Sequence, residues 1–180
     1  MKLIVLDRDG VINEDSEAYI KSPEEWQPIP GSLEAIAALN RAGYQVVVAT
    51  NQSGIARGLY DLDTLARIHE KMHQALAAVG GHIEAVFFCP HGPDDDCDCR
   101  KPRPGLFHDI AGRLRISLEG VPAIGDSLRD LQAAEAVGAL PILVRTGKGR
   151  KTEAELGDAG IPVFDDLAAA VRWLLEGKAG

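Results

Sequence analysis

The chain has 180 residues, 46% of them hydrophobic, and its 27 acidic against 19 basic side chains give a formal net charge of −8 at pH 7. This length makes one domain, since a domain takes about 100–200 residues, and no apolar run approaches the roughly 20 residues that span a bilayer. Disorder and membrane insertion are therefore excluded, and the acid excess disfavours nucleic acid as a partner, because phosphate backbones are bound by clustered Lys and Arg.

Short apolar segments alternate with segments of helical periodicity along the chain. Strands are predicted at residues 3–6, 44–49, 85–88, 121–124 and 141–144, and helices at about 32–42, 62–79, 105–115, 128–137 and 165–176. The last helix carries Leu167, Val171, Leu174 and Leu175 on one side. Because the strands are almost continuously apolar, they fit a parallel sheet covered on both faces. The pattern predicts an α/β fold with a three-layer, Rossmann-like sheet, formed as one domain over residues 1–180.

Two long segments interrupt this alternation. Residues 13–30 follow the first strand and contain three prolines, and residues 89–104 are rich in Cys, Asp, Arg and Pro. Loops of this length in a compact domain are usually functional. In an open α/β sheet, ligands bind beyond the carboxyl ends of the strands. We therefore expect the site at that edge of the sheet.

The first predicted strand ends in Asp7-Arg8-Asp9-Gly10. Two carboxylates two residues apart at a strand end can point toward one site, where their charges repel unless a cation or a shared proton offsets them. Magnesium is the simplest such cation, because it is hard and takes oxygen ligands. The alternative is that acidic residues and a glycine merely terminate the strand.

Two other segments offer groups that bind anions. Residues 50–54, Thr-Asn-Gln-Ser-Gly, can cradle an anion with the Thr50 hydroxyl, the amides and the backbone N–H groups, although such a composition also makes an ordinary polar turn. Residues 100–105, Arg-Lys-Pro-Arg-Pro-Gly, place three cations before a helix. Lys101, held near a carboxylate cluster, can neutralise both a nucleophile and a transferring phosphoryl group.

A further acidic residue follows the fourth predicted strand, in Gly125-Asp126-Ser127-Leu128-Arg129-Asp130. Ser127 and Asp130 fit a helix capping box, which explains them without any function. Asp126 is not explained by the cap. At a third strand end it can complete a magnesium site with the acid pair that follows the first strand.

All three cysteines fall within residues 89–99, as Cys89-Pro90-His91 and Cys97-Asp98-Cys99. An odd number of cysteines in a reducing compartment favours metal binding over disulfides. Three thiolates and one imidazole suit a closed, structural zinc site of tetrahedral geometry, and the alternative is a set of unpaired small hydrophobic residues. Zinc would pin this loop and aim the cations that follow it into the site.

The order acid pair, Thr, Lys, acid at successive strand ends resembles the four signatures of the haloacid dehalogenase superfamily of phosphohydrolases. The resemblance spans nearly the whole chain and implies a phosphatase with an aspartyl-phosphate intermediate and no large cap domain. It implies Asp7 as nucleophile, with Asp9 protonating the leaving alcohol and then activating water. Mg²⁺ would be held by the Asp7 carboxylate, the Asp9 backbone carbonyl and Asp126, with Asp130 behind them, while Lys101 and Thr50 stabilise the phosphoryl group.

The zinc loop directly before Arg-Lys-Pro is similar to that of the heptose-bisphosphate and histidinol-phosphate phosphatases within this superfamily. Residues 7–13, 50–58 and 97–102 match that subgroup closely. The resemblance implies a small sugar phosphate as substrate, with histidinol phosphate as the alternative. The substrate contacts that it implies are Asp15, Tyr19, Asn51, Gln52, Ser53, Gly54 and Arg100, the last as anchor for a second phosphate.

Three other interpretations compete with this one. Residues 69–73, His-Glu-Lys-Met-His, match the H-E-x-x-H signature of zinc proteases, but both histidines lie beside the apolar stripe of a helix and no third ligand follows. A phospho-accepting signalling module also uses clustered Asp, a Thr and a Lys, but accepts phosphate at the end of a middle strand. A zinc-dependent binding module leaves the acid pair unexplained.

The first apolar segment, residues 3–6, is too short for the core of a secretory signal and charges follow it at once. We therefore expect a cytoplasmic protein. We also expect a monomer that acts on a small molecule, without a membrane or nucleic-acid partner.

Overall fold

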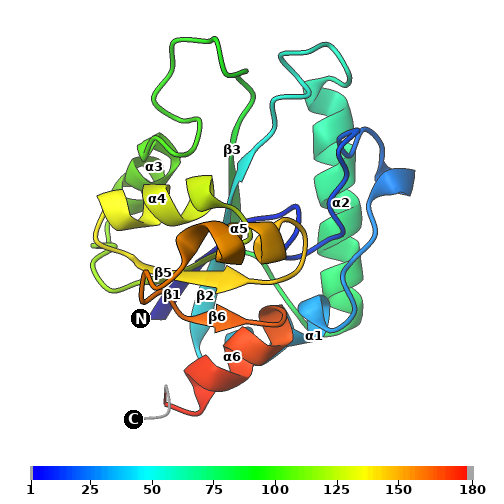
Figure 1. Ribbon diagram of the computed structural model, residues 1–180. Helices are drawn as coiled ribbons and strands as arrows, with labels where there is room; N and C mark the ends of the chain where they lie inside the picture. The colour runs from blue at the N-terminus through cyan, green and yellow to red at the C-terminus, as the bar shows by residue number, and fades with distance from the viewer. Residues whose placement is uncertain (1, 178–180) are drawn as a thin grey trace.

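The computed structural model describes residues 2–177 and contains a parallel sheet of six strands (Figure 1). The strands are β1 (Lys2–Leu6), β2 (Tyr44–Asn51), β3 (Ala85–Cys89), β4 (Pro122–Gly125), β5 (Leu140–Val144) and β6 (Val163–Phe164). The helices are α1 (Ser32–Arg41), α2 (Leu62–Ala78), α3 (Gly105–Leu114), α4 (Leu128–Ala136), α5 (Gly149–Leu156) and α6 (Leu167–Leu175), with a short 3-10 helix at Pro23–Glu25. The predicted α/β fold is confirmed.

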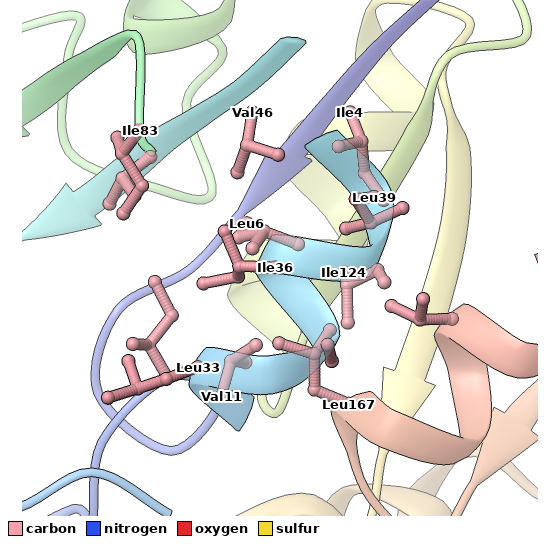
Figure 2. Packing of buried hydrophobic residues seen from close by; sticks show 14 of the residues in the cluster. Ile4, Leu6, Val11, Leu33, Ile36, Leu39, Val46, Ile83, Ile124 and Leu167 are labelled. Atoms are coloured by element: carbon pink, nitrogen blue, oxygen red, sulfur yellow. The ribbon is translucent and has the colours of Figure 1, made fainter. Parts of the chain in front are cut away.

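Helices cover both faces of the sheet because alternate side chains of each strand face opposite sides. Ile4 and Leu6 of β1 join a core with α1, α2 and α6, whereas Leu3 and Val5 join a second core with α3 and α4. Figure 2 shows the first core, where Ile36 and Leu39 of α1 lie beside Leu6 and Ile4 of β1. Two cores on one sheet hold the strand ends in fixed positions.

The strand order is β3-β2-β1-β4-β5-β6, so β1 and β4 are neighbours although 115 residues separate Asp7 from Pro122. The chain winds outward in both directions from this pair, which makes it the topological switch point of the sheet. Asp7 follows β1 and Asp126 follows β4, and Asp7 N donates a hydrogen bond to Ile124 O at 2.9 Å. The two carboxylates therefore meet at the edge where ligands bind.

Two elements and one core assignment differ from the sequence prediction. α5 and β6 were missed, because α5 is mostly polar, with the sequence GRKTEAEL, and β6 has only two residues. Leu167, Val171 and Leu174 are buried as predicted, but Leu175 at the end of α6 is 40% exposed. Within residues 2–177, no helix combines the length and the apolarity needed to cross a membrane.

The predicted insertion at residues 13–30 is an ordered loop held against α2. Asn13 forms isolated bridges with Asp9 and with Pro28, and the Trp26 side chain is fully buried. Lys71 of α2 donates hydrogen bonds from Nζ to the carbonyl oxygens of Pro23 (2.7 Å) and Trp26 (2.8 Å). The loop is therefore anchored at its far end and brings its first half over the strand ends.

Candidate active site

A cleft of about 380 Å³ opens at the carboxyl ends of the strands. Its lining includes the predicted site residues Asp7, Asp9, Asp15, Tyr19, Thr50, Asn51, Gln52, Ser53, Arg100, Lys101 and Asp126. Gly54 is outside this lining and packs against the ring of Tyr60. The fold thus brings together side chains from β1, β2, β4 and both long loops.

Lys101 lies at the floor of the cleft and is 3% exposed. Its Nζ donates to Asp130 Oδ1 at 2.6 Å, to Ala49 O at 2.8 Å and to Asp7 Oδ1 at 3.2 Å. Three donors therefore meet three acceptors, which satisfies a buried ammonium group completely. Burial alone lowers the pKa of Lys101, but the charges of Asp130 and Asp7 outweigh it and raise the pKa, so the residue stays charged.

Asp130 combines the predicted cap with a second contact that the sequence does not show. Its Oδ2 accepts from Asp126 N, Ser127 N and Ser127 Oγ, completing the capping box of α4, while Oδ1 accepts from Lys101. Both oxygens are therefore engaged within the protein. Asp130 lies behind the other acids and holds Lys101 in place.

Asp7, Asp126 and Asp130 each place a carboxylate oxygen within 4.8 Å of the others. Burial and the Asp130 charge raise the pKa of Asp7 to about 7, against the lowering effect of Lys101. Burial and the charges of Asp7 and Asp130 raise the pKa of Asp126 to about 9. One ammonium group does not balance three buried carboxylates, and oxygen ligands suit Mg²⁺, so a divalent cation fits between Asp7 and Asp126.

Gly10 makes room for this arrangement. Its φ of +87° lies in the left-handed region, and a Cβ at this position would overlap the Asp126 carboxylate. A glycine after the acid pair is therefore required by the close approach of the β4 loop, and does more than end the strand.

The Asp9 carboxylate has its own set of hydrogen-bond donors, separate from Lys101. Its Oδ1 accepts from Arg8 Nε and Asn13 Nδ2, both at 2.9 Å, and its Oδ2 accepts from Gln52 Nε2 at 3.3 Å. Burial raises the pKa of Asp9, but the Arg8 charge and these hydrogen bonds outweigh it and hold the pKa below its usual value. The carboxylate is 24% exposed to the cleft.

Two amide side chains that were predicted as substrate contacts are engaged within the protein. Asn51 accepts from Lys101 N at 3.0 Å and donates to Lys101 O at 3.1 Å. Gln52 accepts from the Tyr60 hydroxyl at 2.6 Å and donates to Thr50 Oγ1 at 3.0 Å. Both residues line the cleft, but their amides hold the Lys101 backbone and the Thr50 hydroxyl in position.

Cys89, His91, Cys97 and Cys99 gather in the loop that follows β3, with ligand atoms within 4.8 Å of one another. His91 Nδ1 lies 3.5 Å from Cys89 Sγ and 3.4 Å from Cys99 Sγ, and the Sγ atoms of Cys89 and Cys97 are 3.9 Å apart. These separations match a tetrahedron around zinc, in which Zn–S bonds of about 2.3 Å and Zn–N bonds of about 2.0 Å give S–S edges of about 3.8 Å and S–N edges of about 3.5 Å. The four residues therefore fit a structural zinc ion.

The lining of the cleft also includes three arginines, Arg57, Arg100 and Arg129. Burial and the charges of Arg129 and Arg57 lower the pKa of Arg100. The sequence does not mark Arg129 as a site residue, because there it is one polar residue on the exposed face of a predicted helix. Three cations on the lining of one cleft can bind an anion.

Asp15 and Tyr19 reach the rim of the cleft from the insertion. Asp15 Oδ2 lies 3.3 Å from Lys148 Nζ, and the guanidinium carbon of Arg57 lies 5.6 Å from the centre of the Tyr19 ring. Lys148 belongs to the missed segment around α5, and its backbone N–H also donates to Asp126 Oδ2 at 2.9 Å. The insertion and the α5 segment therefore meet across one side of the cleft.

The competing zinc-protease pattern does not form a metal site. Among the described residues, the two groups that can hold a metal are the zinc-type cluster and the carboxylates, and neither includes His69 or His73. His69 is buried with its Nε2 3.1 Å from Arg8 Nη1, and His73 is exposed. The two histidines of the H-E-x-x-H pattern therefore lie in different surroundings and do not share a metal site.

Two family models match this chain: the HAD-hydrolase-like model over residues 98–170 and the polynucleotide kinase 3 phosphatase model over residues 2–126. The D-glycero-beta-D-manno-heptose-1,7-bisphosphate 7-phosphatase of Bordetella bronchiseptica is 61% identical over 98% of this chain and 99% of its own. The chain belongs to this family of haloacid-dehalogenase-like phosphatases. The resemblance predicted from the strand-end signatures is confirmed.

Other family members agree with this assignment. The Pseudomonas putida protein of the same name is 56% identical over 97% of this chain and all of its own. A crystal structure of the D,D-heptose 1,7-bisphosphate phosphatase from B. bronchiseptica, complexed with magnesium and phosphate, matches with a TM-score of 0.96 at 61% identity, covering 98% of this chain and 99% of that chain. Membership of this family favours an enzyme over a signalling module. The position of the acid pair does not separate the two, because β1 is an interior strand of the sheet, as in a module that accepts phosphate at the end of a middle strand.

Proposed function

We propose that this chain removes the 7-phosphate of D-glycero-β-D-manno-heptose 1,7-bisphosphate, a step in the biosynthesis of nucleotide-activated heptose for the lipopolysaccharide core. The observation that carries this proposal is one cleft whose lining holds two groups of residues that can bind anions: Asp7, Lys101 and Asp126 with the expected Mg²⁺, and the arginines Arg57, Arg100 and Arg129. A bisphosphate has two anionic groups to occupy them. The family to which the chain belongs carries the same activity in its name.

The residues at the floor of the cleft carry out the transfer of the phosphoryl group. Asp7 attacks phosphorus with one carboxylate oxygen, the bond from phosphorus to the sugar oxygen breaks, and an aspartyl-phosphate forms. Lys101 is held 3.2 Å from Asp7 Oδ1, so its charge offsets the negative charge of the phosphoryl oxygens. The Thr50 hydroxyl donates a hydrogen bond to one of these oxygens. The carboxylates of Asp7 and Asp126 and the backbone carbonyl of Asp9 would hold Mg²⁺, which would supply further positive charge for the transferring group.

Asp9 supplies the proton transfers. In the protein without substrate, Arg8 and the hydrogen bonds to Asn13 and Gln52 favour its ionised form. A bound phosphoryl group brings negative charge next to this carboxylate, and a like charge raises a pKa. Asp9 then carries a proton, which passes to the leaving sugar oxygen as the phosphorus–oxygen bond breaks. The resulting carboxylate takes a proton from water, which attacks phosphorus and releases inorganic phosphate and free Asp7.

Arg100 is the proposed anchor for the second phosphate. It belongs to the loop that the zinc site ties down, and its Nη1 donates to His91 O at 3.4 Å. Arg57 and Arg129 add positive charge beside it. A phosphate bound there sets the distance to the reacting phosphate at the floor, which favours a bisphosphate over a monophosphate.

A phosphate-release panel tests the proposal. It compares both anomers of heptose 1,7-bisphosphate, heptose 7-phosphate and histidinol phosphate, each with Mg²⁺ and with a chelator. We expect the highest kcat/KM on the β-anomer of the bisphosphate, with the 1-phosphate retained in the product. Faster release from histidinol phosphate would assign the chain to the alternative function instead.

The matched variant for this panel is Arg100→Ala, with Arg113→Ala of α3 as a control outside the cleft lining. Arg100→Ala is expected to lower kcat/KM on the bisphosphate and to leave release from heptose 7-phosphate nearly unchanged. We further propose that the enzyme acts as a monomer of one domain in the cytoplasm, which gel filtration at working concentration checks for the oligomeric state.

A further inference from the structure

Arg8 is a charged side chain buried beneath the site, with no exposed surface. Its Nε and Nη2 face the same oxygen, Asp9 Oδ1, at 2.9 and 2.8 Å. Its Nη1 lies on the far side of the guanidinium group and contacts His69 Nε2 of α2 at 3.1 Å. Arg8 thus links the proposed acid and base to a helix that lines no part of the reaction chemistry.

His69 accepts the hydrogen bond in this contact. A guanidinium group has donors alone, so His69 Nε2 carries no proton and the ring proton is on Nδ1. Burial and the Arg8 charge lower the pKa of His69 to about 3, which keeps the ring neutral. A neutral ring with a free Nε2 lone pair is the acceptor that this buried cation requires.

We propose that His69 is a positioning residue for the phosphatase reaction, acting through Arg8 on the Asp9 carboxylate. The guanidinium group is planar and rigid, so fixing Nη1 at His69 fixes the direction in which Nε and Nη2 point. The hydrogen bond from Nε and the ion-pair contact of Nη2 set the position of Asp9 Oδ1, and Oδ2 is left toward Gln52 and the cleft. This inference rests on the proposed function, in which Asp9 moves the proton of the leaving group.

The helix offers an internal comparison. His73 is one turn further along α2, within the same H-E-x-x-H pattern, but its side chain is exposed. A role that comes from the contact with Arg8 therefore belongs to His69 and not to His73. The two histidines of the H-E-x-x-H pattern therefore differ: His69 is buried against Arg8, and His73 lies on the surface.

The test compares His69→Gln, which keeps an acceptor near the Nε2 position, with His69→Met, which has a similar length and no strong acceptor. His73→Gln is the control. Each variant is assayed on the heptose bisphosphate, whose alkoxide leaving group needs a proton, and on an aryl phosphate, whose phenolate leaving group does not. Misplacing the general acid lowers kcat chiefly for a substrate whose leaving group must be protonated as it departs.

We expect His69→Met to lower kcat on the bisphosphate by about 100-fold, as for a misplaced catalytic group, with little change in KM. Its loss on the aryl phosphate is expected to be several times smaller, and His69→Gln and His73→Gln stay near the native rate on both substrates. If His69→Met does not fold, His69→Asn, polar but too short to reach Arg8, makes the same comparison.

Equal losses on the two substrates, no loss on either, or no recovery with His69→Gln would overturn the inference. A native chain that releases no phosphate from the bisphosphate would overturn the proposed function instead. The two failures are therefore separate results of one experiment.

Discussion

Replacing Lys101 by Met removes one positive charge from the buried cluster at the floor of the cleft. The native Nζ is 2.6 Å from Asp130 and 3.2 Å from Asp7, and the Lys101 and Asp130 side chains are 3% and 9% exposed. Solvent screens such a pair little, and removing one partner of a buried pair costs about 3–5 kcal/mol of unfolding free energy. We expect a loss in this range at about pH 8.

The loss depends on pH with a defined sign. Burial raises the pKa of Asp130, but Lys101 outweighs it and holds the pKa below the usual value, so this group stabilises the native chain above its unfolded pKa and less as pH falls. Without Lys101, the buried carboxylates of Asp130 and Asp7 take up protons near neutral pH. The difference between native and variant chains therefore shrinks as the pH is lowered toward about 5.

Urea denaturation in the presence of a chelator measures this difference. Lys151→Met is the matched control, because Lys151 is exposed on α5 and the same chemical change there is expected to alter stability by less than about 0.5 kcal/mol. A loss below about 1 kcal/mol, the value of an exposed ion pair, would refute the argument. So would a loss that is equal at the two pH values.

Cys97→Ser is expected to remove bound zinc, measured by elemental analysis, and to lower phosphatase activity while circular dichroism still reports the sheet, because the loop that carries the cations loses its anchor. In the metal-free protein, burial and the neighbouring carboxylates raise the pKa values of Asp7 (to about 7) and Asp126 (to about 9) above the usual value of 3.8. The folded state therefore binds more protons in that interval, and stability falls as pH rises from about 4 to about 9. Thermal melting should therefore show that Mg²⁺ stabilises the protein more at the alkaline end, and equal stabilisation at both ends would contradict this. A Cβ on Gly54 would overlap Tyr60 Cε1, so Gly54→Ala is expected to cost about 1–3 kcal/mol by overpacking, measured by urea denaturation. A Gly54→Ala chain as stable as the native one would show that the Tyr60 ring is free to move.

Local patterns predicted most of the elements, because burial imposes periodicity on strands and helices. Five strands and five helices follow apolar runs in the sequence, but α5 buries only Gly149 and Thr152 and leaves no such run. The order of the strands is not a local property. It depends on which faces of the helices pack together, and it decides that Asp7 and Asp126 meet.

The site shows the same division between local and long-range information. The acid pair, Thr50 and Asp126 are marked by their positions at strand ends, and Lys101 by its place in the cationic segment before α3, so the sequence predicted that they lie together. The contacts that orient them come from distant residues, and the sequence spacing carries no signal for these contacts. Asn51 holds the Lys101 backbone 50 residues away, and Arg8 meets His69 across 61 residues.

Trapping the phosphorylated protein tests the central claim, that Asp7 is the nucleophile. The chain is mixed with excess heptose bisphosphate and Mg²⁺, quenched in acid within one turnover, and reduced with borohydride, which converts an aspartyl-phosphate to homoserine. Trypsin cleaves after Lys2 and Arg8, so residues 3–8 contain Asp7 without Asp9. The account predicts homoserine at position 7 in that peptide. Homoserine at position 9, or no conversion during active turnover, would contradict it.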